Sequence, residues 1–302
     1  MNGDGQSDTF SRSCRHWSED GQAGMAAFYR LASIDYRLLA EELDWLRLFR
    51  ELARRCEPGI RLLDVACGSG RFPAALLDHG GLRTSRDVSV KYSLLDPSEF
   101  SLRSARRQLT GPFEPSEEHL CTIQQFAPET SRYDVVWATH ALYCVPPSEL
   151  VLAADSMLSA LEASGLGFIA HASRRSHYVR FHDLYLQGRQ SGHAEPFSTG
   201  EQLIDVLQAK VGTLRYWSID YEGRLDLDDR DTAERYLQRC LFDDTISLDE
   251  MLADRRMGDH LRGCIDHGSG TWRFPQTVWL IFFGELAEGI DDFRRGRGPQ
   301  DR

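Results

Sequence analysis

The segment from Leu62 to Pro73 constrains the fold most strongly. It reads LLDVACGSGRFP: an apolar run ends in Asp64, Gly68 and Gly70 follow with one residue between them, and a helical pattern begins at once. Glycine has no Cβ, so the backbone can turn sharply there and let a ligand lie against the main chain at a helix N-terminus. The segment therefore predicts a strand–loop–helix unit of the kind that binds nucleotides.

Short apolar runs and helical stretches alternate around this unit. We expect strands at 61–66, 90–96, 121–125, 133–139 and 165–172. Between them the pattern predicts helices at 72–79, 98–109 and 147–163. This alternation is typical of an α/β protein with a mostly parallel sheet covered by helices on both faces.

The rest of the chain follows other patterns. From 24 to 55 apolar residues recur at intervals of three and four, which indicates two amphipathic helices or one bent helix. Beyond 172 we expect a helix capped by Ser198 in a capping box with Glu201. The pattern then predicts a strand at 214–221, helical structure from 232 to 265 and a last strand at 277–283, an arrangement that suggests a closing hairpin with an inserted cap.

We expect one domain over residues 21–288. It divides into a helical lid (24–57), a cofactor-binding core (60–172), cap elements that bind the substrate (173–270) and a final strand (271–285). The polar segments 1–20 and 289–302 are expected to be mobile.

Composition excludes several classes of protein. The 35 basic and 46 acidic residues give a net charge of −11, which argues against general electrostatic binding to nucleic acid or to an anionic membrane. The seven cysteines include no C-x-x-C pair, so neither a disulfide framework nor a zinc knuckle is expected. The first residues contain no apolar segment and no apolar run is long enough to span a bilayer, so we expect a cytoplasmic protein.

Two kinds of nucleotide ligand compete for the glycine loop. A dinucleotide fingerprint has a third glycine where Pro73 stands, and the Asp64 carboxylate would repel a pyrophosphate. S-adenosylmethionine carries an amino group and a sulfonium but no phosphate, so it fits this carboxylate better. Asp96, at the end of the second strand, is placed to accept hydrogen bonds from ribose hydroxyls. The plainer alternative is that Gly68 and Gly70 only form a tight turn and that Asp96 is a turn acid.

Residues 64–70 resemble the D/E-x-G-x-G-x-G motif of the class I S-adenosylmethionine-dependent methyltransferases, with Ala66 at the first glycine. The stretches LLDPSEF, ATHALYCVPP and FPQTVWLIFFGE also resemble histamine N-methyltransferase-like enzymes. The resemblance implies a Rossmann-like sheet of seven mostly parallel strands, an N-terminal helical lid and a helical insertion before the last strand. It implies S-adenosyl-L-methionine as cofactor, S-adenosyl-L-homocysteine as product, a small-molecule acceptor, and a monomer or homodimer.

The resemblance and the residue chemistry together define a candidate site. The expected cofactor-binding residues are Asp64, Ala66, Cys67, Gly68, Gly70, Asp96, Pro97, Ser98, Gln125, Phe126 and Thr139. The expected acceptor-binding residues are His140, Tyr143, His171, Tyr178 and Gln276. We expect His140 to be the catalytic base, because imidazole titrates near neutral pH, and Tyr143 to orient it. The plainer alternatives are a turn cap at His140, a core-edge Gln276 and a surface loop around a buried Phe126.

Two further groups of residues have alternative interpretations. Residues 173–182 mix cations with aromatic rings, and they would hold an acidic or aromatic acceptor or form a solvated helix face. His177 and His182 are five residues apart, an awkward spacing for shared ligation, so no metal site is expected. The aromatic residues near the N-terminus would cover the cofactor or form a core stripe: Trp17, Phe28, Tyr29 and Tyr36.

The sequence favours methyl transfer from S-adenosylmethionine to an N or O nucleophile of an amine, an amino-acid derivative or a natural product. Two alternatives stay open: a protein that binds this cofactor without transferring its methyl group, such as a cyclase or a regulator, and an NAD(P)-dependent oxidoreductase. A nucleic-acid methyltransferase is disfavoured by the net charge and because no Asn/Asp-Pro-Pro-aromatic tetrad follows the fourth strand.

Overall fold

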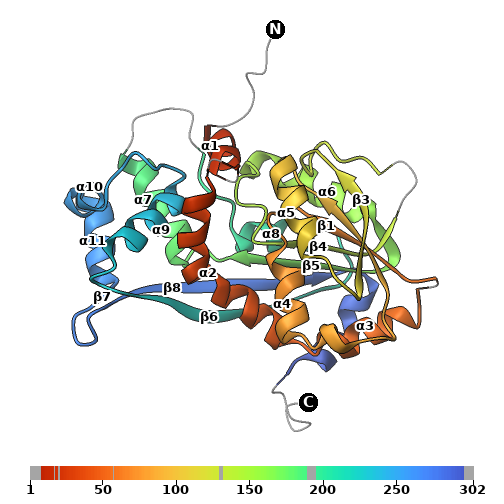
Figure 1. Ribbon diagram of the computed structural model, residues 1–302. Coiled ribbons are helices and arrows are strands. Elements are labelled where there is room, and N and C mark those ends of the chain that lie inside the picture. The colour runs from red at the N-terminus through yellow and green to blue at the C-terminus, as the bar shows by residue number, and fades with distance from the viewer. Residues whose placement is uncertain are drawn as a thin grey trace.

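A computed structural model describes residues 8–16, 18–19, 21–56, 58–128, 132–188 and 195–295 of the 302-residue chain. A twisted mixed sheet crosses the molecule between helices on both of its faces (Figure 1). Within the described ranges its main path runs in the order β3-β2-β1-β4-β5-β8-β6, and the two-residue β7 (Ile265–Asp266) pairs with β8. The predicted α/β class and mostly parallel Rossmann-like sheet are confirmed.

The first five strands are parallel, so their carboxyl ends lie at one edge of the sheet: β1 (Ile60–Val65), β2 (Val90–Leu95), β3 (Phe113–His119), β4 (Tyr133–Thr139) and β5 (Leu161–Ala172). The connections contain α4 (Arg71–His79), η1 (Leu82–Thr84), α5 (Glu99–Gln108), η2 (Pro147–Glu149) and α6 (Leu150–Ala160). The strand order reverses between β1 and β4, and ligands of open α/β sheets bind at such a switch point.

The C-terminal part adds an antiparallel ribbon and a helical cap. Strand β8 (Thr271–Phe283) pairs with β5 and, over its whole length, with β6 (Leu214–Asp226). Between β6 and β8 the chain forms α9 (Arg230–Leu241), α10 (Leu248–Ala253) and α11 (Arg255–Gly263). Figure 1 shows these helices at the left end of the sheet beside α7 (His177–Gly188), while α8 (Gly200–Gln208) covers the middle.

The N-terminal segment forms three helices: α1 (Asp8–His16), α2 (Gln22–Glu42) and α3 (Trp45–Ala53). Helix α2 ends at the extended residue Leu43, and the side chain of Asp44 then caps α3 by accepting a hydrogen bond from Arg47 N. The apolar stripe at 24–55 is therefore two helices. In Figure 1, α2 passes in front of the sheet between the cap and the parallel strands. No helix of the described ranges combines the length and the hydrophobicity needed to cross a bilayer.

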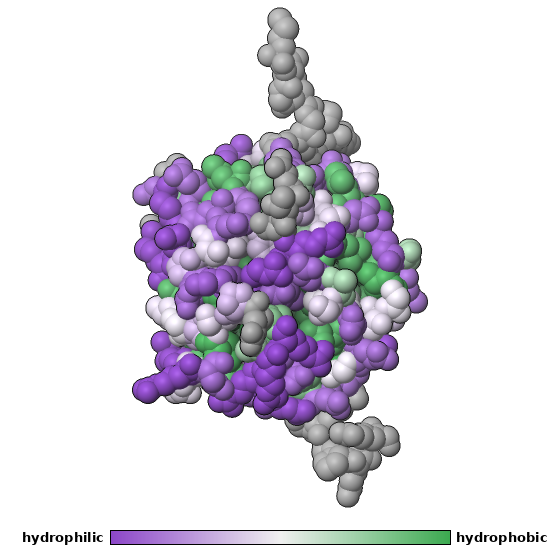
Figure 2. Space-filling model, turned by 90° about the vertical axis from the view of Figure 1, so that its right-hand side faces the viewer, coloured by the Kyte–Doolittle hydropathy of each residue, from purple (hydrophilic) through white to green (hydrophobic). Residues whose placement is uncertain are grey.

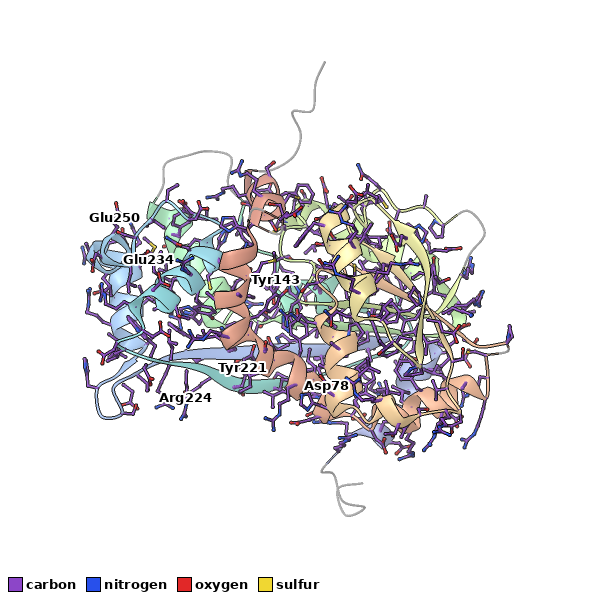
Figure 3. All side chains as sticks on the ribbon, in the orientation of Figure 1. Asp78, Tyr143, Tyr221, Arg224, Glu234 and Glu250 are labelled. Carbon is purple, nitrogen blue, oxygen red and sulfur yellow. The ribbon has the colours of Figure 1, made fainter. Side chains whose placement is uncertain are left out.

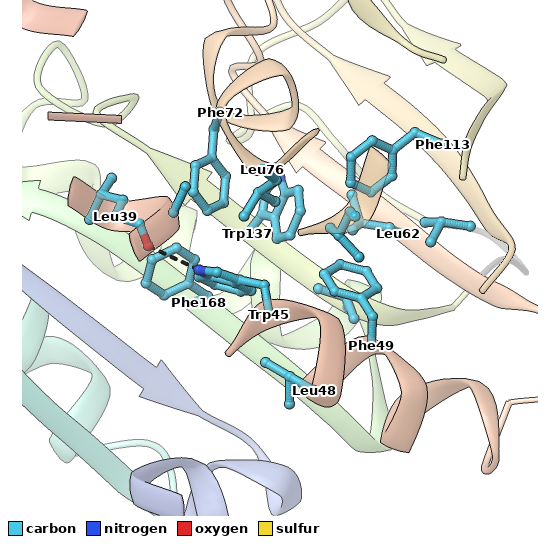
Figure 4. Packing of buried hydrophobic residues seen from close by; sticks show 14 of the residues in the cluster. Leu39, Trp45, Leu48, Phe49, Leu62, Phe72, Leu76, Phe113, Trp137 and Phe168 are labelled. Atoms are coloured by element: carbon cyan, nitrogen blue, oxygen red, sulfur yellow. Dashed lines mark hydrogen bonds between the residues drawn. The ribbon is translucent and has the colours of Figure 1, made fainter. Parts of the chain in front are cut away.

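A cluster of aromatic rings joins α3, α4 and the sheet (Figure 4). Trp45 packs edge-on against Phe168 at 5.4 Å, and Phe72 packs against Trp137 at 5.0 Å, all four side chains being almost completely buried. The indole Nε1 of Trp45 donates a hydrogen bond of 2.9 Å to the carbonyl of Leu39. Leu39 lies in the last turn of α2, where carbonyls lack intrahelical partners, so this bond ties the end of α2 to the core.

The polar side chains cover most of the face shown in Figure 2, and apolar side chains form separate areas between them. This face corresponds to the right-hand end of the molecule in Figure 1. Most of the large apolar side chains of the described residues lie inside, in three clusters along the sheet and under the cap.

The third strand lies earlier than the sequence predicted. It was expected at 121–125, but residues 113–119 form β3 and residues 123–125 form a turn. Strand β3 is the edge of the sheet, and five of its seven side chains are exposed. An edge strand needs no apolar alternation, and its sequence FEPSEEH therefore gave no strand signal.

The predicted boundaries also need correction. The cap of α8 is Thr199, whose capping box includes Gln202, whereas Ser198 is buried and donates a hydrogen bond to Leu142 O. The expected mobile start contains α1, in which Thr9 is 2% exposed. The 310 helix η3 (Glu285–Phe293) continues past 288, into the segment that was expected to be mobile. Residues 1–7, Trp17 and 296–302 lie outside the described residues.

Replacing Trp45 by Phe tests the link between α2 and the core. The change removes the hydrogen bond from the indole to Leu39 O and leaves a cavity in the core. We therefore expect the free energy of unfolding to fall by about 2–4 kcal/mol. Urea denaturation followed by circular dichroism measures it. The matched control, Leu120→Ala at a 60% exposed side chain, should change stability by less than about 0.5 kcal/mol. Equal stability of Trp45→Phe and the wild type would contradict this role.

Candidate active site

A cavity lies where the carboxyl ends of β1, β2 and β4 face helix α2. The glycine loop between β1 and α4 forms one wall, and α2 contributes the wall opposite. Residues of α7, β6, α9 and β8 extend the cavity toward the cap. Figure 3 shows two of its lining side chains, Tyr143 and Tyr221, close to α2 in the middle of the molecule.

The glycine loop turns through three residues with left-handed backbone: Ala66 (φ +49°), Gly68 (φ +53°) and Gly70 (φ +73°). A Cβ added at Gly68 would meet no atom within 4 Å, so the backbone there faces open space. A Cβ at Gly70 would lie 2.9 Å from Ala105 Cα, so this glycine allows α4 to start close to α5. Ala66 adopts a conformation that costs a non-glycine residue about 1 kcal/mol.

Asp96 connects this loop to the end of β2. Its Oδ2 accepts a 3.0 Å hydrogen bond from Gly68 N, and its Oδ1 accepts a 2.8 Å bond from Ser98 N. Burial raises the pKa of Asp96 to about 6, although these backbone bonds favour the ionised form. The carboxylate therefore fixes the loop and keeps further lone pairs for a ligand.

Asp64 is a second buried carboxyl group, 2% exposed, at the penultimate position of strand β1 before the loop. Its Oδ2 accepts a 2.7 Å hydrogen bond from the Tyr92 hydroxyl, and its Oδ1 has no hydrogen-bond partner among the described residues. Burial raises the pKa of Asp64 to about 7, against the effect of the Tyr92 bond. A cation beside Asp64 would therefore stabilise the ionised form.

Helix α2 closes over the loop through Tyr29. Ser69 Oγ donates a 3.1 Å hydrogen bond to the Tyr29 hydroxyl, and the guanidinium of Arg71 lies over the Tyr29 ring at 4.0 Å. Tyr29 therefore contacts both residues that flank Gly70, Ser69 and Arg71. This contact supports the interpretation of the N-terminal aromatic residues as a cover for the cavity.

On the other side of the cavity, Asp35, His140 and Tyr143 form a connected set. His140 follows β4 with left-handed backbone (φ +54°), and its Nδ1 lies 2.8 Å from the Tyr143 hydroxyl. Its Nε2 lies 3.0 Å from Asp35 Oδ2 without the alignment of a good hydrogen bond. Strained backbone of this kind is concentrated at functional sites, where the surrounding structure holds it.

The hydrogen-bond network assigns the protons of this set. The Tyr143 hydroxyl oxygen accepts a 3.3 Å bond from Ala172 N, so its own hydrogen is free to point at His140 Nδ1. The other ring nitrogen, Nε2, then carries the hydrogen that faces Asp35. Burial raises the pKa of Tyr143 well above its usual value, with the charge of Asp35 as the next cause, so Tyr143 stays protonated. Nδ1 of His140 is thus occupied by Tyr143, while Nε2 faces Asp35 without a hydrogen bond.

Most of the residues predicted from the sequence meet in this cavity: Asp64, Ala66, Cys67, Gly68, Asp96, Pro97, Ser98, Thr139, His140, Tyr143, Tyr178 and Gln276. Gly70 lies behind the loop and supports it by close packing. Of the 173–182 stretch, Tyr178 lines the cavity, while Arg174, Arg175 and Arg180 are exposed.

Besides Gly70, three predicted residues do not line the cavity. Gln125 is exposed and accepts a hydrogen bond from Thr122 N, because the shift of β3 places it in a turn; Gln124 lines the cavity instead. Phe126 packs on the His119 ring at 4.8 Å. His171 is buried beneath Tyr143, with ring centroids 4.1 Å apart, and its Nε2 lies 3.0 Å from Ser198 O. His171 therefore supports Tyr143 from behind.

Sequence reasoning missed Asp35, Tyr221 and Tyr236, which also line the cavity. A signal for Asp35 was present, since it is a single acid on the helical face of α2 that otherwise carries apolar residues. Tyr221 and Tyr236 come from β6 and α9, and nothing in their local sequence distinguishes them from core residues.

The fold and the site define a class I S-adenosylmethionine-dependent methyltransferase. The protein family described as a methyltransferase domain matches residues 36–210, more than half of the chain, and the protein therefore belongs to this family. The predictions of the class and of S-adenosyl-L-methionine as cofactor are confirmed. The narrower resemblance to histamine N-methyltransferase-like enzymes stays a prediction. No curated protein matches the chain.

Solved structures show the same fold. The BH2331 protein of Bacillus halodurans C-125 is 13% identical, with 80% of this chain and 98% of that chain covered and a TM-score of 0.53. Magnesium protoporphyrin IX methyltransferase of Synechocystis PCC 6803 is 11% identical, with 91% and 99% covered and a TM-score of 0.50. At these identities the similarity establishes the fold alone.

The pKa of Asp64 leads to a prediction about cofactor binding. Because a cation binds the ionised carboxylate, lowering the pH from 8 to 6 through the pKa of about 7 should weaken S-adenosylmethionine binding about tenfold. Isothermal titration calorimetry across this range measures the dependence. In Asp64→Asn we expect weaker binding at pH 8 and a much shallower pH dependence. The exposed Asp78→Asn serves as control and should behave as the wild type. An unchanged pH dependence in Asp64→Asn would exclude this role.

Proposed function

We propose that the protein transfers the methyl group of S-adenosylmethionine to a nitrogen or oxygen nucleophile of a small molecule. Amines, amino-acid derivatives and aromatic natural products are the acceptor classes that the cavity suits. The observation that carries this proposal is the position of Asp35, which lies beside His140 in a cavity lined by aromatic rings and continuous with the glycine loop.

The cofactor end is defined by the loop and by the two buried carboxyl groups. Asp64 would compensate the positive charge of the cofactor, and Asp96 would accept hydrogen bonds from its ribose. The open space beside Gly68 lets a ligand lie against the main chain. The bound cofactor supplies a methyl group on a sulfonium, which is already an activated electrophile.

The chain's own task is therefore mainly to hold the acceptor. Catalysis by positioning requires the nucleophile about 3 Å from the methyl carbon, in line with the bond that breaks, and water excluded. Helix α2 contributes to both ends, since Tyr29 covers the loop and Asp35 lines the acceptor end. Closure of α2 would thus order both parts of the site.

The acceptor end favours an organic cation. Aromatic rings from four elements and the loop after β4 line it together with one carboxylate: Phe28, Tyr36, Tyr143, Tyr178, Tyr221 and Tyr236, with Asp35. The faces of aromatic rings attract cations, and a carboxylate binds ammonium groups directly. Gln276, whose amide donates to the Tyr236 hydroxyl at 3.3 Å, adds a polar group at the far end.

A protonated amine must lose a proton before it can attack a methyl group. With the protons assigned as above, neither ring nitrogen of His140 has a free lone pair, since Nδ1 accepts from the Tyr143 hydroxyl and Nε2 carries a hydrogen that faces Asp35 without a hydrogen bond. Asp35 Oδ1, in contrast, is an acceptor atom that accepts no hydrogen bond from the described residues. We therefore assign the proton acceptor to Asp35 and assign to His140 the role of orienting it. This revises the sequence-based assignment of His140 as the base.

Replacing Asp35 by Asn tests this assignment. The wild type is incubated with S-adenosylmethionine and a panel of small amines and phenols, and S-adenosylhomocysteine is measured. With an accepted amine, Asp35→Asn should lower kcat about 100-fold or more, because a positioned base contributes 10²–10⁴. Binding of S-adenosylhomocysteine should stay within about threefold of the wild type, since Asp35 lies at the acceptor end.

His140→Asn and Asp78→Asn complete the series. His140→Asn should lose less activity than Asp35→Asn, since the carboxylate remains, and the exposed Asp78→Asn should match the wild type. Full turnover by Asp35→Asn would remove the carboxylate from the mechanism. Methylation of peptides or nucleic acids but of no small molecule would overturn the proposed acceptor class.

A further inference from the structure

Three potential metal ligands converge in the cap, outside the methyl-transfer cavity. They are His177 at the start of α7, His260 in α11, and Cys264 directly after α11. His177 Nδ1 lies 2.9 Å from His260 Nε2, and Cys264 Sγ lies 3.8 and 3.9 Å from these two nitrogens. None of the three residues lines the cavity described above.

These separations match the face of a tetrahedral zinc site. Zinc bonds of about 2.0–2.1 Å to nitrogen and about 2.3 Å to sulfur place two nitrogens about 3.3 Å apart and nitrogen and sulfur about 3.6 Å apart. The observed distances differ from these values by a few tenths of an ångström. A hydrogen bond between the two histidines explains the short N–N contact, but it gives no reason for the thiol to face both nitrogens.

The two imidazoles are available as ligands for a borderline-soft metal ion. Burial lowers the pKa of His177 well below its usual value and that of His260 to about 4, so both imidazoles are neutral and offer lone pairs at pH 7. Burial raises the pKa of the Cys264 thiol to about 11, against the smaller effect of Arg180, so this thiol would lose its proton to solvent only as the metal–sulfur bond forms. Imidazole and thiolate together are ligands typical of zinc.

We propose that His177, His260 and Cys264 form a binding site for Zn²⁺ that fastens α7 to α11. Three protein ligands leave one position of the tetrahedron for a water molecule or a further ligand. His260 and Cys264 are four residues apart, so one helical turn presents both ligands on the same face. This spacing of four residues is the sequence signal for the site, although no metal site was expected from the sequence.

The proposed zinc site lies next to the wall of the acceptor cavity. The residue after His177 is Tyr178, which lines the acceptor cavity, and the His177 ring lies 6.1 Å from the ring of Tyr236, another lining residue. A metal that holds α7 against α11 would therefore stiffen the acceptor wall without taking part in methyl transfer.

Metal titration of the tag-free, full-length protein tests the proposal. After treatment with a chelator and its removal, the wild type should bind one Zn²⁺ per chain in calorimetry. At about 100 times Kd, Zn²⁺ should raise Tm by roughly 5 °C. Co²⁺ used as a spectroscopic probe should give a thiolate-to-cobalt charge-transfer band together with visible bands of tetrahedral intensity.

Two variants and two matched controls make the result specific. Cys264→Ser and His260→Gln should each lose the Tm shift and at least tenfold in affinity. Cys121→Ser and His267→Gln, at less buried positions, should bind as the wild type. His260 is only half-buried, so His260→Gln tests the site even if Cys264→Ser fails to fold.

Failure to bind Zn²⁺ more tightly than about 100 μM would overturn the proposal. So would a cobalt spectrum without the thiolate band, or unchanged binding in His260→Gln. Loss of binding in His267→Gln alone would place the ion elsewhere and would overturn it as well.

Discussion

Ionising a carboxyl group inside a protein costs free energy, and this cost determines which ligands the site can bind. Asp64 and Asp96 lie at the carboxyl ends of neighbouring parallel strands, where burial raises their pKa values to about 7 and about 6. Backbone donors at Gly68 and Ser98 compensate Asp96, whereas Asp64 accepts a hydrogen bond from the Tyr92 hydroxyl at Oδ2 and no hydrogen bond from the described residues at Oδ1. In the proposed site, the positive charge of S-adenosylmethionine would compensate the Asp64 carboxylate, and its ribose hydroxyls would donate hydrogen bonds to Asp96.

Helix α2 makes the two halves of the site depend on each other. Tyr29 contacts the glycine loop, and Asp35, less than two turns further along, reaches His140 after β4. The end of the same helix is held by the Trp45 indole in the aromatic core. A shift of α2 would therefore move Tyr29 away from the glycine loop and Asp35 away from His140 together, so packing far from the cavity affects both parts of the proposed site.

The sequence predicted those parts whose local pattern determines their structure. The run at 60–65 is buried on both faces and the glycines after it need positive φ, so β1, the loop and α4 could be placed from residue types alone. Strand β3 could not be placed in this way, because an exposed edge strand carries no apolar alternation. Asp35 and the pair His177–His260 acquire their meaning only when distant segments pack together, and no single stretch of sequence contains that information.

In the proposed site, one cavity holds S-adenosylmethionine against Asp64 and Asp96 with its methyl group toward Asp35. A crystal structure of the complex with S-adenosylhomocysteine would show whether this placement is right. We expect the ribose hydroxyls within hydrogen-bonding distance of Asp96, the amino group beside Asp64 and the sulfur facing the cavity end that contains Asp35. Electron density for the ligand outside this cavity, or a sulfur turned away from Asp35, would contradict it.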